Sequence, residues 1–284
     1  MTKLGYYPGC SLEGTASDYG ISVRRMARAL GWELQEIEDW NCCGATAAHQ
    51  TNHLLALSLP ARDLALAEEQ GITELLVPCA ACFSRLVHAN KAMQQDPETA
   101  REINDIIEMN YRGTVSVLNL IEALQKYAMP DIAGKVQRNL SGLKVACYYG
   151  CLLLRPPKYT EFDDAEQPSS MEDIVRALGA EPLDWPFKTE CCGAGLSMSN
   201  TGAVVDLTHK ILENARHHGA RVIAVACPMC HSNLDMRQLD VSRRYGKYNI
   251  PILFLSQLVG LALGVSEKEL GLKKHFVKAT SIIR

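Results

Sequence analysis

The chain has 284 residues, of which 47% are hydrophobic and 21% are charged, and its formal net charge is −3. This composition is typical of a globular protein with room for two ordinary domains, and it excludes a disordered chain. The small net charge offers no broad electrostatic basis for binding nucleic acid or an acidic membrane surface, so we expect neither kind of partner.

The distribution of apolar residues predicts a protein without a membrane-spanning segment. The N-terminus lacks the long apolar stretch of a signal peptide, and the most apolar stretch, 252–264, is interrupted by Ser256 and Gln257. That stretch is about half of the roughly 20 residues that span a bilayer. We therefore expect a cytoplasmic protein, in which eleven cysteines indicate metal binding or catalysis more than structural disulfides.

In chain order, strands and helices alternate in each half of the sequence. The first half is predicted to contain a strand at 3–7, a helix from Ser17 or Asp18 to Gly31, a strand before Cys42, a helix at 54–70, a buried strand at 75–77 and a mostly helical segment at 89–140. The second half is predicted to contain a strand at 143–148, an inserted loop at 152–168, helices at 170–179 and 204–218, a strand at 222–226 and a tail at 267–284.

Ten of the cysteines form two copies of one spacing. Each copy has a single cysteine, an adjacent pair followed by glycine, and a C-x-x-C group. The first copy is Cys10, Cys42, Cys43, Cys79 and Cys82, and the second is Cys151, Cys191, Cys192, Cys227 and Cys230. One C-x-x-C group is weak evidence for a metal site, but the repetition of the whole pattern is strong evidence.

Other residues repeat with the cysteines. Arg28-Ala29-Leu30-Gly31 recurs as Arg176-Ala177-Leu178-Gly179, 148 residues later (176 − 28). An internal duplication of this length predicts two pseudo-symmetric, Rossmann-like α/β domains with small parallel sheets, 1–140 with a helical extension and 141–284 with a C-terminal tail. Each cysteine group would then follow a strand, which places the metal clusters at the strand C-terminal ends.

The number of thiols in each copy bears on the kind of metal centre. Zinc closes its coordination shell with four ligands, whereas each copy supplies five thiols, two of them adjacent. Adjacent side chains diverge, which favours a multi-iron site over a single small ion. Structural zinc at one site and a dithiol–disulfide relay through the C-x-x-C pairs remain alternatives. His231 is a candidate catalytic residue because it follows Cys230 directly, and the role of Cys147, the eleventh cysteine, stays open.

The duplicated module with Cys-Cys-Gly, over residues 3–235, resembles the catalytic B subunit of heterodisulfide reductase, and the resemblance extends into the C-terminal tail. It implies a non-cubane [4Fe–4S] cluster on the five cysteines of each copy, held by all ten positions named above. It also implies an oxidoreductase acting on sulfur groups, of the CoB–CoM heterodisulfide reductase type, which reduces a small-molecule disulfide to two thiols or runs the reverse reaction. Electrons would come from two partners in the same complex, the cubane iron–sulfur (C-type) and flavin (A-type) subunits.

Related modules leave the function open. Similar iron–sulfur subunits occur in lactate and glycerol-3-phosphate dehydrogenases and in a succinate/quinone type, where they transfer electrons. Another branch performs thiol or persulfide chemistry in bacterial sulfur oxidation. A zinc-stabilised binding protein is a third possibility. The substrate, the direction of the reaction and the oligomeric state are not predicted.

Overall fold

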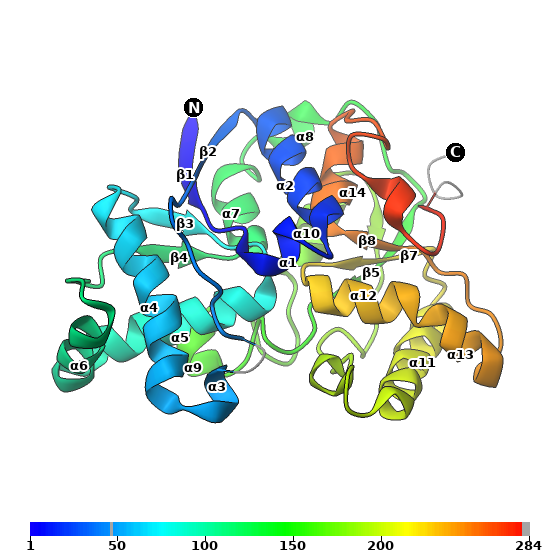
Figure 1. Ribbon diagram of the computed structural model, residues 1–284. Helices are drawn as coiled ribbons and strands as arrows, with labels where there is room; N and C mark the ends of the chain where they lie inside the picture. The colour runs from blue at the N-terminus through cyan, green and yellow to red at the C-terminus, as the bar shows by residue number, and fades with distance from the viewer. Residues whose placement is uncertain (46–47, 280–284) are drawn as a thin grey trace.

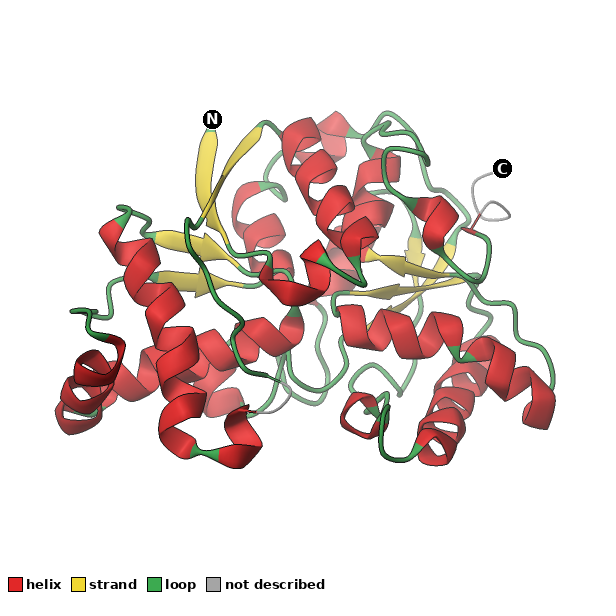
Figure 2. Cartoon of the chain, in the orientation of Figure 1, coloured by secondary structure: helices red, strands yellow, loops and turns green. Residues whose placement is uncertain are grey.

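The computed structural model describes residues 1–45 and 48–279, which form two α/β halves side by side (Figures 1 and 2). The first half contains β1 (Thr2–Tyr6), α1 (Gly9–Glu13), α2 (Ser17–Leu30), β2 (Trp32–Glu36), α3 (Ala48–Thr51), α4 (His53–Glu69), β3 (Glu74–Leu76), α5 (Ala80–Gln95), α6 (Pro97–Ile107), β4 (Ser116–Leu118), α7 (Leu120–Tyr127) and α8 (Ile132–Lys135). The second half contains β5 (Lys144–Tyr148), α9 (Pro157–Thr160), α10 (Ser170–Ala177), β6 (Glu181–Pro182), the 3₁₀ helix η1 (Ala194–Leu196), α11 (Thr201–His217), β7 (Val222–Val225), α12 (Pro228–Met236), α13 (Gln238–Tyr245), β8 (Ile252–Phe254), α14 (Leu255–Ala262) and the 3₁₀ helix η2 (Leu272–Lys274).

Each half has a four-stranded parallel sheet with the same strand order. The orders are β2-β1-β3-β4 and β6-β5-β7-β8, and the register runs, for example, from Val145 opposite Val222 to Tyr148 opposite Val225. Strand β7 is buried along its whole length, as expected for a parallel sheet covered by helices on both faces. The predicted fold class is confirmed, with helices flanking both sheets.

The predicted elements of the duplicated core are confirmed, with shifts of a few residues at their ends. Helix α2 ends at Gly31, whose φ of 77° is the left-handed conformation that glycine adopts at low energetic cost. Its N-cap is Ala16 rather than Ser17 or Asp18. Asp18 lies instead in the first turn, where the helix dipole favours a negative charge.

The sequence analysis missed the fourth strand of each half and, in the second half, the helix that follows it. Strand β4 and helix α7 lie within a segment that was predicted to be mostly helical, and strand β8 with helix α14 fills the apolar stretch near the C-terminus. The helical prediction for this part of 89–140 is confirmed by α7, which Asn119 and Glu122 begin with a reciprocal capping box. This part of the repeat was hidden because β4 and β8 begin 136 residues apart (252 − 116), whereas the repeated residues named above are offset by 148.

The two halves pack across each other. Helix α2 of the first half packs against α14 of the second, and α10 of the second packs against α7 of the first. Near the centre, Ser22 and Ser256 are joined by a buried hydrogen bond of 2.6 Å between their hydroxyl oxygens. The division at residues 140 and 141 stays a prediction, because these helix pairs cross it. None of the helices in the described ranges is long and apolar enough to cross a membrane.

Tyr19 links the backbones of the two halves just before their C-x-x-C groups. The ring is fully buried and stacks on Phe254 with a centroid separation of 4.0 Å. Its hydroxyl lies 2.9 Å from the carbonyl oxygen of Pro78 and 3.4 Å from that of Ala226. These residues immediately precede Cys79 and Cys227. One side chain of the first half therefore ties together the two segments that lead into the C-x-x-C groups.

Replacing this hydroxyl is expected to destabilise the contact between the halves. Tyr19→Phe keeps the stacked ring but removes the single hydroxyl proton that the buried carbonyl groups of Pro78 and Ala226 share, which costs about 1–3 kcal/mol. Chemical denaturation of the full chain measures this loss. Tyr127→Phe is the control, because the Tyr127 hydroxyl bonds Glu74 near the surface, where a substitution usually changes stability by less than about 0.5 kcal/mol. Equal effects of the two variants would contradict the linking role of Tyr19.

Candidate metal centres

All three cysteine groups of each half lie at the C-terminal edge of its sheet. In the first half, β1, β2 and β3 end shortly before Cys10, Cys42 and Cys79. In the second half, β5, β6 and β7 stand in the same relation to their three cysteine groups. Because the strands within a sheet are parallel, these loops meet at one edge, where open α/β folds place their ligands.

Sulfur atoms from different loops approach one another in both halves. Cys42 Sγ lies 3.8 Å from Cys10 Sγ, and Cys43 Sγ lies 3.3 Å from Cys82 Sγ. In the second half, Cys192 Sγ lies 3.5 Å from Cys230 Sγ. All eleven cysteines lie in the described ranges, and none of them forms a disulfide. Two groups of reduced thiols therefore lie at equivalent places in the two halves.

The C-x-x-C groups sit at helix N-termini. Cys79 is the N-cap of α5, and Cys227 is the N-cap of α12. The second cysteine of each group lies in the first turn of the same helix. The unpaired N–H groups and the positive end of the helix dipole favour thiolates at this position. These helix ends can therefore support thiolates that bind a metal.

Shared protons separate the pKa values of neighbouring thiols. The pKa of Cys43 is lowered to about 3, first by a hydrogen bond from Cys42 and then by one from Cys82. The pKa of Cys82 is raised well above its usual range, because it bonds Cys43 and Cys79 and is buried. In the second half the pKa of Cys191 is lowered to about 6, chiefly by its hydrogen bond with Cys151. A metal ion, which binds thiolates, would replace these shared protons.

Two glycines make room for the thiols. Gly9 and Gly150 precede the first cysteine of each copy, with φ values of 66° and 69°. A Cβ atom on Gly9 would lie 3.1 Å from Cys82 Sγ, and one on Gly150 would lie 3.0 Å from Cys230 Sγ. Both positions therefore need glycine for two reasons, the left-handed backbone and the space beside a sulfur atom.

A tyrosine in each half fixes the loop that enters the Cys-Cys-Gly turn. The Tyr7 hydroxyl donates to the carbonyl oxygen of Asn41 at 2.7 Å, and the Tyr148 hydroxyl donates to that of Glu190 at 2.5 Å. Each acceptor immediately precedes a cysteine pair. The sequence analysis did not assign this role, although the repeated Tyr-x-Gly-Cys pattern at 7–10 and 148–151 could have indicated it.

Further polar groups hold the two turns differently. In the first half, the buried Asp63 carboxylate accepts the Asn41 N–H at 2.8 Å. Burial, with a smaller contribution from the nearby Cys43, raises the pKa of Asp63 to about 8, against the effect of that N–H group. In the second half, Asn233 Nδ2 donates to the carbonyl oxygen of Cys192 at 3.0 Å and lies 3.7 Å from its sulfur atom. Neither residue was predicted, because each acts on one copy only.

Two cations near the second site are engaged in internal contacts. Lys188 Nζ lies 2.7 Å from the buried carboxylate of Glu172, which also accepts from the Tyr149 hydroxyl at 2.5 Å. Arg155 bonds Thr189 and the side chain of Glu166. These residues shape the loops around Cys151 and Cys191. Their contacts give them a structural role beside the site.

The contacts of Cys147 and His231 lie outside the groups of thiols. Cys147 lies within strand β5 and is fully buried, and burial raises the pKa of its thiol well above the usual range. The His231 ring stacks on Phe254, with a centroid separation of 4.2 Å, and its Nε2 lies 3.2 Å from the carbonyl oxygen of Ile252. The ten-cysteine ligand set and the catalytic role of His231 stay predictions.

Comparison with known proteins identifies the family. The family model of the cysteine-rich CCG domain matches residues 4–87 and 145–235, which contain both groups of five thiols. The chain belongs to the CCG cysteine-rich domain family. One match lies within each half of the structure, which confirms that the family domain occurs twice.

Relatives of almost the same length have two different names. The chain is 36% identical over 284 residues to the 8-methylmenaquinol:fumarate reductase membrane anchor subunit of Wolinella succinogenes, covering 99% of both chains. It is 32% identical over 286 residues to the B subunit of the ferredoxin/F420H2-dependent CoB–CoM heterodisulfide reductase of Methanosarcina acetivorans, covering 98% of this chain and 95% of that protein. This CCG chain therefore resembles subunits of redox complexes.

A solved structure shares the fold. A hypothetical protein from Helicobacter pylori superposes with a TM-score of 0.82 at 15% sequence identity. The match covers 99% of this chain and 53% of that one, so this chain spans about half the length of that protein. At this level of identity the likeness concerns the arrangement of the two α/β halves.

Proposed function

We propose that each half binds a non-cubane [4Fe–4S] cluster and that the two clusters together interconvert a disulfide and two thiols. The donor chemistry supports the cofactor: each half gathers five thiols at one sheet edge, two of them adjacent, beside a glycine that leaves room for sulfur. Cys10, Cys42, Cys43, Cys79 and Cys82 would hold one cluster, and Cys151, Cys191, Cys192, Cys227 and Cys230 the other.

The observation that carries the proposal is the proximity of the two C-x-x-C groups. The Tyr19 hydroxyl reaches the residues before Cys79 and Cys227. In addition, the pKa of Cys227 is lowered chiefly by a hydrogen bond from Cys230, with a contribution from the backbone N–H of Ala81, which lies inside the first C-x-x-C group. A group from one half thus contacts a thiol of the other. Two metal centres on these thiols would face one another across the boundary between the halves.

The exposure of the thiols fits a reaction with a small molecule. Cys10 and Cys42 of the first half and Cys191 of the second are exposed, while both C-x-x-C pairs are buried. Reduction of a disulfide takes two electrons and two protons and yields two thiols, which must be kept apart until they leave. When bound, the two iron–sulfur clusters supply the electrons and a binding place for each sulfur. The protein holds the two sites side by side and leaves one side of each open.

The proposal requires partner subunits. The sequence has neither a glycine-rich dinucleotide motif nor a ferredoxin-type run of cysteines. Electrons would therefore come from a partner that carries cubane iron–sulfur clusters and ultimately from a flavin protein, as the resemblance implies. The name of the Methanosarcina relative, a B subunit, supports assembly into such a complex.

An iron–sulfur electron-transfer protein within a larger complex is the second candidate function. The relative from Wolinella succinogenes, a subunit of a fumarate reductase that uses a methylmenaquinol, favours it. In this alternative the same ten thiols bind both clusters, but no thiol substrate binds between them.

One experiment separates these functions. The full chain is purified without oxygen, its iron, acid-labile sulfide and zinc are measured, and its paramagnetic spectrum is recorded after oxidation with and without small thiols. About eight iron per chain, as two four-iron clusters require, and a signal that appears only with a thiol are expected. Eight iron without a thiol-dependent signal would favour electron transfer. Zinc on the cysteines without sulfide would refute both redox functions.

A further inference from the structure

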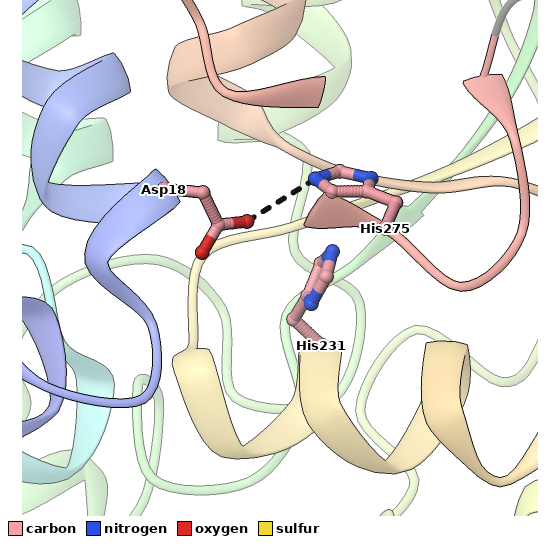
Figure 3. Close-up of side chains that lie close together, drawn as sticks. All are labelled: Asp18, His231 and His275. Atoms are coloured by element: carbon pink, nitrogen blue, oxygen red, sulfur yellow. Dashed lines mark ion pairs between the residues drawn. The ribbon is translucent and has the colours of Figure 1, made fainter. Parts of the chain in front are cut away.

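Three buried side chains that are far apart in the sequence converge where the two halves and the C-terminal tail meet. Asp18 comes from the first turn of α2, His231 from α12, and His275 from the segment after η2 (Figure 3). Their exposed fractions are 6%, 8% and 7%. One ligand atom from each residue lies within 4.8 Å of the others. This set of two imidazoles and one carboxylate is separate from the groups of thiols.

The protein alone does not satisfy the hydrogen bonding of His275. Its Nε2 lies 3.2 Å from Asp18 Oδ2 and 2.9 Å from the amide nitrogen of Gln257. A protonated Nε2 can donate to Asp18 but then faces the amide N–H, whereas an unprotonated Nε2 can accept from the amide but then faces the carboxylate. Either way, one of the two close contacts is unfavourable. The other ring nitrogen, Nδ1, is buried without a partner among the described residues.

A cation among the three residues would remove the repulsion between the Asp18 carboxylate and an unprotonated His275 Nε2. The Nε2 lone pair and the Asp18 carboxylate would both bind the ion. The Gln257 amide would give up its contact with Nε2 and keep its bond to the carbonyl oxygen of Leu270 at 3.1 Å. Two ligand atoms that each lie about 2.0–2.2 Å from a tetrahedral ion are about 3.3–3.6 Å apart. The 3.2 Å distance between Asp18 and His275 is close to the lower end of this spacing. His231, whose ligand atom lies within 4.8 Å of the other two, would move closer to complete the set.

We propose that Asp18, His231 and His275 form a binding site for a divalent transition-metal ion, with zinc as the best match. Two imidazoles and a carboxylate are ligands that zinc accepts, and three protein ligands leave a fourth position for water. The site joins α2 of the first half, α12 of the second half and the tail. Its role is to hold these three segments together behind the helix that carries Cys227 and Cys230.

Neighbouring contacts hold the tail against this site. The Asp235 carboxylate accepts the backbone N–H groups of Phe276 and Val277 at 2.7 and 3.0 Å. Lys274 Nζ donates to the Ser17 hydroxyl at 2.5 Å. These bonds place His275 opposite Asp18 whether or not metal is present. Only the ligand set itself therefore needs to adjust when the ion binds.

Zinc-edge X-ray absorption of the full chain tests the proposal, because iron does not contribute at that edge. The protein is purified without oxygen, incubated with zinc sulfate and passed over a desalting column. About one zinc per chain is expected, with nitrogen and oxygen neighbours only, consistent with distances of about 2.0–2.2 Å. Wild-type protein that retains no zinc would overturn the proposal. A sulfur neighbour at about 2.3 Å would also overturn it, because the zinc would then be on the cysteines.

Variants show whether the zinc is bound by these three residues. His275→Gln and Asp18→Asn are expected to lose the bound zinc while keeping the iron and acid-labile sulfide of the wild type. His217→Gln, at the exposed C-terminal end of α11, is the matched control and should retain zinc. If one of these two variants fails to fold, the other still tests the assignment. The zinc-edge spectrum of the wild type requires neither variant. Full zinc retention in a variant with intact iron content would refute the assignment. Because the readout is zinc, it is independent of the proposed disulfide chemistry.

Discussion

Cys192→Ser is expected to remove about half of the iron from the chain and to abolish disulfide reduction. Cys192 is buried, with its sulfur atom 3.5 Å from that of Cys230, and Asn233 holds its carbonyl group in place. A serine hydroxyl is a harder and shorter ligand than a thiolate, so the second cluster should be lost. About four of about eight iron would remain. The loss of activity should exceed the roughly 10–100-fold effect typical of removing a group that only orients a ligand.

Cys147→Ala is the matched control for this experiment. Cys147 is also buried in the second half, only four residues before Cys151, but it lies inside β5 and is paired opposite Ala224 in the sheet. The alanine variant should keep the full iron content and the thiol-dependent signal. Analysis of iron and acid-labile sulfide per chain in both variants tests this expectation. If Cys147→Ala lost iron while Cys192→Ser retained it, the assignment of the ten ligands would be wrong.

Gly150→Ala is expected to disrupt the second metal centre without changing any cysteine. The new Cβ would lie 3.0 Å from Cys230 Sγ, on a backbone with φ of 69°. The left-handed conformation costs an alanine about 1–2 kcal/mol, and the methyl group would also displace the sulfur atom from its position. We expect the iron content to fall toward that of Cys192→Ser, with the first centre intact.

Gly219→Ala separates the two effects of that substitution. Gly219 has a similar φ of 81°, but the nearest atom to a new Cβ would be Lys144 Cδ at 4.0 Å. The control should therefore lose about the same stability through backbone strain and keep all of its iron. Thermal unfolding and iron analysis of both variants make the comparison. If both variants kept all of their iron, the space beside Cys230 would not be required for the metal centre.

The two halves are similar in backbone and different in the groups around their thiols. Asp63 fixes the Cys-Cys-Gly turn of the first half, whereas Asn233 fixes that of the second. The two thiols released from an unsymmetrical disulfide are chemically different from each other. Under the proposed function, this difference between the two sites lets each site bind a different thiol.

The duplication, the ten repeated cysteines and the parallel α/β class could all be predicted from the sequence. The reason is physical: thiols at constant spacing and buried apolar strands leave a local pattern that each copy repeats. The glycines before Cys10 and Cys151 belong to the same pattern. The fourth strand of each half escaped detection, because β4 is only three residues long and its counterpart β8 comes after a different spacing.

The sequence by itself therefore determined the two repeated groups of five cysteines and the half in which each group lies. Only the tertiary structure decided how the halves meet: α2 packs on α14, Tyr19 connects the segments before both C-x-x-C groups, and Asp18, His231 and His275 converge from three distant segments. These contacts depend on helix packing between residues more than 200 positions apart, as between Tyr19 and Ala226. Packing over such distances leaves no periodic or local signal in one sequence, because any apolar or polar residue of suitable shape can provide it.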